Sequence, residues 1–369
     1  MMNTPALEVA IDTGPLYGHR TGVAVAVDGL VTALRARDDV HLSPYLVSFR
    51  SDPDPGHRKL PLPGIVASHL WSRVDRPRAD RWLGPADVVH GTNYVAPPSA
   101  RPTVISVYDC WFLAHPDAAS PLVRRAGRTL RRRVADGAWI HTSSAATAEQ
   151  ARTLLDTDRV VSVHLGPPPH SGALPASTPS ALEPLHGSTF IVAIGTEERR
   201  KDLPTLVAAF GELAHDQPML RLALAGARGD QSHEIDLAVE VLDPAVRARV
   251  HRLGPVDATT KAWLLRHASV LAYPSLDEGF GFPILEAQAA GTPVVATDVG
   301  SVSEVAGAGA ALVAGGSSTR FAEQLGAVVD GTVSRLSLIS AGHENLARFS
   351  WAATADGLAA LYRRAMEER

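Results

Sequence analysis

One segment in the second half of the chain constrains the fold most strongly, because it places a strand, a loop, a helix and a second strand in immediate succession. Residues 269–274 form a short apolar run suited to a buried parallel strand. Pro283 suits the first turn of a helix, and residues 284–290 are helix formers. Residues 291–297 then restart a strand. Together they predict a strand–helix–strand unit within an α/β parallel-sheet domain.

The loop of this unit contains two glycines and two carboxylates. Gly279 and Gly281 allow close backbone approaches, so peptide N–H groups there can face an anion such as a diphosphate. Glu286 lies near the start of the helix, where a carboxylate can accept hydrogen bonds from a ribose diol. A sugar nucleotide therefore fits this loop. The alternative is that Glu278 is a solvated loop acid and Glu286 a helix-start acid favoured by the helix dipole.

The segment resembles the retaining glycosyltransferases of family 4. The motifs that carry the resemblance are Glu278-Gly-Phe-Gly-Phe-Pro-Ile-Leu-Glu286-Ala, Gly291-Thr-Pro-Val-Val and Gly300-Ser-Val-Ser-Glu304-Val. The resemblance implies a GT-B fold, in which two Rossmann-like domains face a central cleft. It also implies that Glu286 binds the nucleotide ribose, that Glu278 lies beside the donor sugar, and that Gly279, Phe280 and Gly281 belong to the donor site.

A second block strengthens the resemblance. Residues 190–203 look like the family's strand, glycine and basic-pair signature, with Gly195 after the strand and Arg200 and Lys201 a few residues later. Two cations at that place can neutralise the charge that grows on a departing nucleoside diphosphate. The alternative is that an adjacent arginine and lysine before a helix are simply solvated.

Length and composition agree with two soluble domains. A chain of 369 residues exceeds the usual single domain, and a net charge of −4 gives no general nucleic-acid signal. The only cysteine, Cys110, cannot form an intrachain disulfide, so we expect a cytoplasmic protein. We find neither a signal peptide nor an apolar run of membrane-spanning length in the sequence.

Alternating strand-like and helical runs lie on both sides of a stretch rich in proline and glycine, residues 166–179. We predict a first domain at residues 1–170, a linker at 171–187 and a nucleotide-sugar-binding domain at 188–350. By family resemblance, residues 351–369 form a helix that returns to the first domain.

The first domain contributes weaker motifs. By resemblance, Gly22 begins a helix at a glycine loop of the donor site, and Tyr108-Asp109 stands where the family usually has His-Asp. The phenol of Tyr108 can still donate a hydrogen bond to a donor sugar. Asp109 either positions an acceptor hydroxyl or caps the next turn. For Ser144 and Thr147 we favour helix-cap chemistry.

Metal chemistry has little support in the sequence. The Asp-x-Asp triplets at residues 52–54 and 156–158 lie in connections typical of turns. His233-Glu234 and His343-Glu344 lack a second histidine at zinc spacing. We therefore expect no metal and no cofactor besides the nucleotide-diphosphate sugar, which is a substrate.

A basic run follows the Tyr108-Asp109 segment. It contains Arg124, Arg125, Arg128, Arg131, Arg132 and Arg133. Positions 124, 128 and 132 share one face of a helix. A solvated face is one interpretation, and peripheral contact with an anionic membrane or a lipid-diphosphate acceptor is the other.

These observations favour a retaining glycosyltransferase that moves a hexose from a nucleotide-diphosphate sugar to a glycan, lipid-linked or small-molecule acceptor. Resemblance favours GDP-mannose as the donor. Arg200 and Lys201 would stabilise the departing phosphate, Glu278 would orient the sugar and Glu286 would fix the ribose. The alternatives are a sugar-nucleotide epimerase on the same fold and a catalytically silent sugar-nucleotide binder, for which Tyr108 is the main argument.

Overall fold

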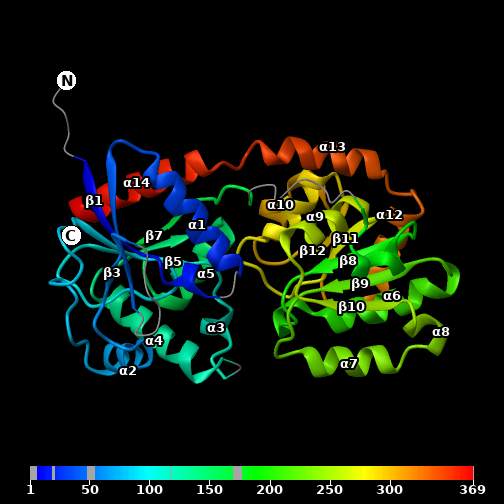
Figure 1. Cartoon of the computed structure of the whole chain (residues 1–369), viewed down its shortest axis with the longest axis horizontal. Helices are drawn as coiled ribbons and strands as arrows, with labels where there is room; N and C mark the ends of the chain where they lie inside the picture. Colours follow the sequence, from blue (N-terminus) through cyan, green and yellow to red (C-terminus); the bar gives the residue numbers. More distant parts are fainter. Residues whose placement is uncertain (1–5, 19–20, 48–54, 118, 169–176, 369) are drawn as a thin grey trace. The chain divides into compact units, whose positions relative to one another are not determined.

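The computed structural model describes residues 6–18, 21–47, 55–117, 119–168 and 177–368 (Figure 1). Two compact units divide the chain: unit 1 is Met1–Gly166 together with Phe349–Arg369, and unit 2 is Pro167–Arg348. Part of the predicted linker, residues 171–176, and the Asp-x-Asp triplet at residues 52–54 lie outside the described residues.

Unit 1 is built on a parallel sheet of seven strands among its described residues. The spatial order is β3-β2-β1-β4-β5-β6-β7, so the chain begins in the middle of the sheet and extends to both edges. The strands are β1 (Leu7–Asp12), β2 (Val40–Leu46), β3 (Arg58–Lys59), β4 (Val88–Gly91), β5 (Thr103–Val107), β6 (Trp139–Thr142) and β7 (Val160–Ser162).

Helices cover both faces of this sheet. On one face α1 and the C-terminal helix α14 pack on β1, β4 and β5, and on the other face lie α2, α3, α4 and α5. The helical elements of unit 1 are η1 (Gly14–Tyr17), α1 (Gly22–Arg35), α2 (Gly64–Arg73), α3 (Trp111–Ala114), α4 (Pro121–Ala135), α5 (Ala145–Leu155) and α14 (Trp351–Glu367). Each unit is thus a three-layer α/β/α sandwich, since unit 2 repeats the plan.

Unit 2 has a parallel sheet of six strands in its described part, in the order β10-β9-β8-β11-β12-β13. Its central strands are fully buried apolar runs, as expected for a sheet with helices on both faces. The strands are β8 (Phe190–Ile194), β9 (Arg221–Ala225), β10 (Val250–Gly254), β11 (Val270–Tyr273), β12 (Val294–Thr297) and β13 (Ala311–Val313).

Two apolar clusters, one on each face of the sheet, form the core of unit 2. The first joins the sheet to α6, α7, α8 and α12, and the second joins it to η2, α9, α10 and α11. The helical elements are η2 (Ser180–Leu185), η3 (Arg199–Lys201), α6 (Leu203–Asp216), α7 (Ser232–Glu240), α8 (Pro244–Arg247), α9 (Ala258–His267), α10 (Phe282–Ala290), α11 (Val302–Ala306), η4 (Gly307–Gly309), α12 (Ser318–Val329) and α13 (Arg335–Leu346).

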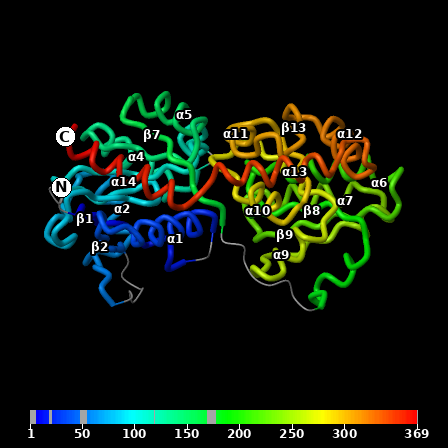
Figure 2. Tube along the Cα trace, turned by 90° about the horizontal axis from the view of Figure 1, so that it is seen from above, coloured from blue at the N-terminus to red at the C-terminus, as the bar shows by residue number. Residues whose placement is uncertain are grey.

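The C-terminal helix α14 is an integral part of unit 1, where it lies beside α1 (Figure 2). Gly29 of α1 makes this close packing possible, because a Cβ there would come within 2.2 Å of the Trp351 ring. Farther along α14, the buried hydroxyl of Tyr362 hydrogen-bonds Nδ1 of His90 at 2.7 Å. Residues far apart in the sequence therefore share one core.

The prediction of two Rossmann-like parallel-sheet domains is confirmed by the strand pairings within each unit. The predicted strand–helix–strand segment is present as β11, α10 and β12. Within the predicted linker, residues 180–185 form η2, and both Leu182 and Leu185 are buried in the core of unit 2. This part of the linker is therefore packed against the second sheet.

Candidate functional site

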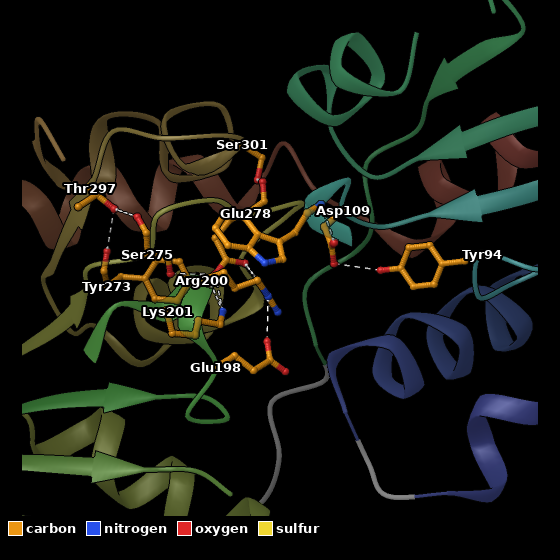
Figure 3. Close-up of polar contacts among 11 residues, drawn as sticks. Tyr94, Asp109, Glu198, Arg200, Lys201, Tyr273, Ser275, Glu278, Thr297 and Ser301 are labelled. Carbon is orange, nitrogen blue, oxygen red and sulfur yellow. Dashed lines mark hydrogen bonds and ion pairs between the residues drawn. The ribbon is translucent and has the colours of Figure 1, made fainter. Parts of the chain in front are cut away.

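The carboxylate of Glu278 is the centre of a polar cluster in unit 2 (Figure 3). Arg200 Nη1 donates to its Oε2 at 3.0 Å, while Lys201 Nζ and Ser275 Oγ both donate to Oε1, the latter at 2.8 Å. The Glu278 side chain is only 5% exposed. A carboxylate offers about four lone-pair positions, and with the Tyr273 hydroxyl, which also hydrogen-bonds to Glu278, its neighbours occupy about all of them.

The charges of this cluster shift the pKa of each partner. Burial by itself raises the pKa of Glu278, but attraction to Lys201 and Arg200, with hydrogen bonds, outweighs it and lowers the pKa from 4.5 to about 2. The pKa of Lys201 lies below its ordinary value, because burial disfavours the ammonium more than Glu278 favours it. Glu278 is therefore ionised at neutral pH, and the more exposed carboxylate of Glu198 pairs with Arg200 as a second counter-charge.

The backbone around Glu278 is held by the loop that follows β12. Ser301 donates to the Glu278 carbonyl oxygen through its backbone N–H at 3.1 Å and through Oγ at 3.0 Å. Gly300, at φ +52°, has no room for a side chain, since a Cβ would lie 2.6 Å from that same carbonyl oxygen. The loops after β11 and β12 therefore fix one another.

The loop after β8 supplies both cations and is anchored at its other end. Gly195 directly follows β8 with φ +148°. Its carbonyl oxygen lies so close to Gly226 that a Cβ added to Gly226 would come within 1.8 Å of that oxygen. Farther on, the buried Glu197 carboxylate accepts hydrogen bonds from Arg252 Nε at 3.1 Å and from the Ser232 hydroxyl. With this end anchored, Arg200 and Lys201 reach Glu278 from a fixed backbone.

The position of the cluster in the sheet is typical of a ligand site. The chain runs from β8 outward to β9 and β10 on one side, and then returns to β11 on the other. Arg200 and Lys201 follow β8, and Glu278 follows β11. In open α/β sheets, ligands bind at the carboxyl ends of the strands where the strand order reverses in this way.

The glycine segment after Glu278 leads directly into α10. Gly281 has φ +95°, a left-handed conformation that favours glycine, and it forms the N-cap of the helix. Phe280 is buried, and its ring packs edge-on against Phe282 with the centroids 5.3 Å apart. The predicted residues Gly279, Phe280 and Gly281 thus form the turn between the Glu278 cluster and the helix N-terminus.

Glu286 lies one turn into α10 and makes a different contact. Its Oε1 accepts a hydrogen bond from Lys261 Nζ at 2.5 Å, and Lys261 belongs to the neighbouring helix α9. The Glu286 side chain is 13% exposed and that of Lys261 is 25% exposed. Glu286 is therefore neither a freely solvated helix acid nor a member of the Glu278 cluster.

The predicted residues of unit 1 lie at the end of β5 and in the turn that follows. Tyr108 is buried, its Oη has no hydrogen-bond partner among the described residues, and burial raises the pKa of this phenol. Asp109 Oδ1 accepts from the Trp111 backbone N–H at 3.2 Å, so the capping interpretation is confirmed. Its Oδ2 accepts from Tyr94 Oη at 3.0 Å (Figure 3), and the catalytic assignment of Asp109 stays a prediction.

The third predicted residue of unit 1, Gly22, lies at the start of α1, near other residues at the carboxyl edge of the first sheet. Gly22 is the first residue of α1, whose N-cap Thr21 accepts a hydrogen bond from a backbone N–H. Asp12, at the end of β1, accepts from the Gly14 backbone N–H at 2.9 Å, and burial raises its pKa to about 6. Helix capping is confirmed for Ser144, whose Oγ accepts from the Thr147 backbone N–H at 3.1 Å.

The arginine run lies on α4, and much of it is engaged within unit 1. Arg133 is buried and pairs with Asp75 and Asp136, and Arg132 donates to backbone carbonyl oxygens of α2. The predicted face of positions 124, 128 and 132 therefore needs correction. Arg132 packs toward α2, and the two exposed arginines of that face are Arg124 and Arg128.

The described part of the chain contains no group of three or more histidine, cysteine, aspartate or glutamate side chains that could hold a metal ion. Nor does any helix in that part have the length and apolar character needed to cross a bilayer.

Several residues of the candidate site and its surroundings were not predicted from the sequence. Ser301 stands inside a quoted motif and Ser275 lies just before one, but serine at a strand end is common and gave no separate signal. Glu197 stands next to Glu198 in a charged run, so its role could not be separated from that of its neighbour. Its contact with Arg252 follows only from the order of the strands in the sheet. Lys261 has no motif at all, because its partner Glu286 lies 25 residues away.

Comparisons with known proteins agree with this geometry. The family model described as "Glycosyl transferases group 1" matches residues 188–330, which contain the whole Glu278 cluster. The D-inositol 3-phosphate glycosyltransferase of Nocardia farcinica is 32% identical over 334 residues, which cover 83% of this chain and 68% of that protein.

Two solved structures show the same fold. WaaG, a glycosyltransferase involved in lipopolysaccharide biosynthesis, superposes with a TM-score of 0.72 at 17% identity, covering 95% of this chain and 98% of WaaG. Anabaena Alr3699/HepE, solved in complex with UDP and glucose, gives a TM-score of 0.69 at 16% identity, covering 96% and 98%. The GT-B fold predicted from the motifs is thus confirmed.

We predict that Glu278→Gln lowers the free energy of unfolding of unit 2 by about 3–5 kcal/mol at pH 7, because it leaves two cations without their buried counter-charge. The folded-state pKa is depressed, so the stabilisation is present above pH 4.5 and is lost as the pH falls from 4.5 toward about 2. Urea unfolding followed by hydrogen exchange of peptides from residues 188–330 measures the loss at each pH.

Glu198→Gln is the matched control, because the Glu198 carboxylate also pairs with Arg200, at 2.9 Å, but is 41% exposed. Its loss should be at most about 1 kcal/mol. Equal losses for the two variants would contradict the assignment of Glu278 as the central counter-charge.

Proposed function

The chain belongs to the group 1 glycosyl transferases, and from that premise we propose that it moves a hexose from a nucleotide-diphosphate sugar to an acceptor hydroxyl with retention of anomeric configuration. The observation that carries this proposal is the position of Arg200 and Lys201, both held by Glu278 at the carboxyl ends of β8 and β11.

The two cations would bind the diphosphate of the donor. Lys201 is mostly buried and Arg200 is 22% exposed. A phosphate that binds beside them gives up hydrogen bonds to water and gains hydrogen bonds to donors held in place. Because little water is present, the attraction between the opposite charges is only weakly screened. The two cations favour the product diphosphate over the sugar nucleotide, because the product carries one more negative charge. Arg200 and Lys201 thus stabilise the charge that develops as the leaving group departs.

The bond changes balance without an enzymic nucleophile. The bond between the donor's anomeric carbon and the β-phosphate oxygen breaks, and the acceptor oxygen bonds to that carbon on the same face. The acceptor proton passes to the departing phosphate oxygen. Because Arg200 and Lys201 supply the positive charge, we propose that no metal or other cofactor is required.

Glu278 has two roles in this proposal. It fixes the cations, and by family resemblance it lies beside the donor sugar, which it would orient. Glu286, one turn into α10, would bind the ribose. Mannose remains our preference for the hexose, on resemblance alone. For the acceptor we favour a small phosphorylated polyol, since the relative at 32% identity is named for inositol 3-phosphate.

We predict that one of UDP, GDP and ADP binds selectively in calorimetry without added metal, and that Glu286→Ala weakens its affinity by about 10-fold or more. The expected loss is that of a charge-assisted hydrogen bond to the ribose. Addition of a chelator should leave the affinity unchanged. Failure of all three nucleotides to bind the wild-type chain would reject the donor site.

Product analysis separates the competing functions. A transferase joins the sugar to the acceptor and releases the nucleoside diphosphate. An epimerase transfers no sugar to an acceptor and yields a sugar nucleotide with a changed sugar configuration. A silent binder, the alternative that Tyr108 raised, binds the nucleotide but turns over no donor with any acceptor.

We propose separately a peripheral membrane contact through the N-terminal part of α4. Arg124 and Arg128 are exposed there, and the nearby Leu122 is 53% exposed. The neighbouring helix α2 exposes Ile65, which is 68% accessible. Cations beside exposed apolar side chains suit the interface of an anionic bilayer.

We predict that the chain sediments with vesicles containing anionic phospholipid and not with vesicles of phosphatidylcholine alone. The double variant Arg124→Glu, Arg128→Glu should reverse most of that binding, because each cation near such a surface contributes about 1 kcal/mol. Arg152→Glu, at an arginine of α5 that is 38% exposed and pairs with Glu149, serves as the control, with thermal unfolding to check its fold. Equal sedimentation with both vesicle types, or an unaffected double variant, would reject the contact.

A further inference from the structure

The pairing of Glu286 with Lys261 sets the chemistry available at the start of α10. One carboxylate oxygen, Oε1, accepts a hydrogen bond from the lysine ammonium, and within the described residues Oε2 has no such donor. Both side chains are partly buried but reach solvent, at 13% and 25% exposure. A ligand at this place meets a carboxylate oxygen and an ammonium side by side.

An ammonium has three N–H donors and no acceptor, so Lys261 keeps two donors after its bond to Glu286. Each hydroxyl of a ribose diol can both donate and accept. A lone carboxylate would use only the donor capacity of the diol, whereas the pair can use one hydroxyl as a donor and the other as an acceptor. The pair is also neutral overall, so it does not repel the diphosphate of the same ligand.

We propose that Lys261 is a second ribose-binding residue. Its ammonium donates to the oxygen of one ribose hydroxyl, while the free carboxylate oxygen of Glu286 accepts from the other hydroxyl. The inference rests on the proposed donor site and deepens it. It assigns a residue of α9, outside all the sequence motifs, to the recognition of the nucleotide.

The competing interpretation is that Lys261 only ties α9 to α10. The chain offers a matched case of such a tie: Arg266, also on α9, donates from Nη1 to the backbone oxygen of Ala290 at the far end of α10, at 3.1 Å. A purely structural cation should behave like Arg266 when it is removed. A ribose-binding cation should instead show a dependence on the ligand's hydroxyl groups.

The test uses calorimetry on the full chain, with the nucleoside diphosphate that wild type selects from UDP, GDP and ADP, and with its 2′-deoxy and 3′-deoxy forms. Lys261→Met removes the donor, and Lys261→Gln provides a second, polar variant should the first fold poorly. Glu286→Gln removes the carboxylate charge, and Arg266→Met is the structural control. Thermal unfolding checks the fold of each variant.

We expect Lys261→Met and Lys261→Gln to lower the affinity for the parent nucleotide by about 10-fold, which is the effect of losing one charge-assisted hydrogen bond. For the deoxy form that lacks the hydroxyl bound by Lys261, the same variants should cause no further loss. Glu286→Gln should cause no further loss of affinity for the other deoxy form, which lacks the hydroxyl bound by Glu286. Arg266→Met should bind all three ligands as wild type does.

Two results would overturn the inference while the donor site stands: unchanged or tighter binding of the parent nucleotide by the Lys261 variants, or an equal loss for all three ligands. Absence of nucleotide binding by wild type would reject the donor site itself, and the role of Lys261 with it. Because the wild-type titration is read first, the two failures are distinguishable.

Discussion

The structure of the candidate site depends on a single buried negative charge, the Glu278 carboxylate. An ionised carboxylate out of water is costly unless donors and opposite charges surround it. Here Arg200, Lys201 and Ser275 meet that need, and they come from the loop after β8 and the loop after β11. Because the Glu278 charge must be neutralised, the loop after β8 is held against the loop after β11, at the point where the strand order reverses. The same contacts hold two cations where a diphosphate would lie.

The rest of the local structure keeps this arrangement rigid. Gly226 and Gly300 let neighbouring loops approach more closely than any side chain would allow, and Ser301 binds the backbone of the Glu278 loop. The buried Glu197, paired with the half-buried Arg252, anchors the other end of the cation loop. Arranging the donors before the ligand arrives reduces the reorganisation that the reaction requires.

Local patterns in the sequence were sufficient for the fold and for part of the site. The strand, loop, helix and second strand around Gly281 follow one another directly in the sequence, so β11, α10 and β12 could be predicted. Arg200, Lys201 and Glu278 were identified, but their mutual contacts follow from the order of strands in the sheet. Lys261 could not be found, since its partner lies on another helix. The engagement of Arg132 with α2 likewise depends on helix packing that a run of arginines does not reveal.

The most direct test of the account is to measure how much of the donor affinity resides in the terminal phosphate. Calorimetry would compare the nucleoside diphosphate with the monophosphate for wild type and for Lys201→Met. The account predicts that wild type prefers the diphosphate by about 100-fold, and that the preference falls to about 10-fold or less in the variant, through loss of a charge-assisted contact. An unchanged preference would show that the Glu278 cluster does not bind the diphosphate.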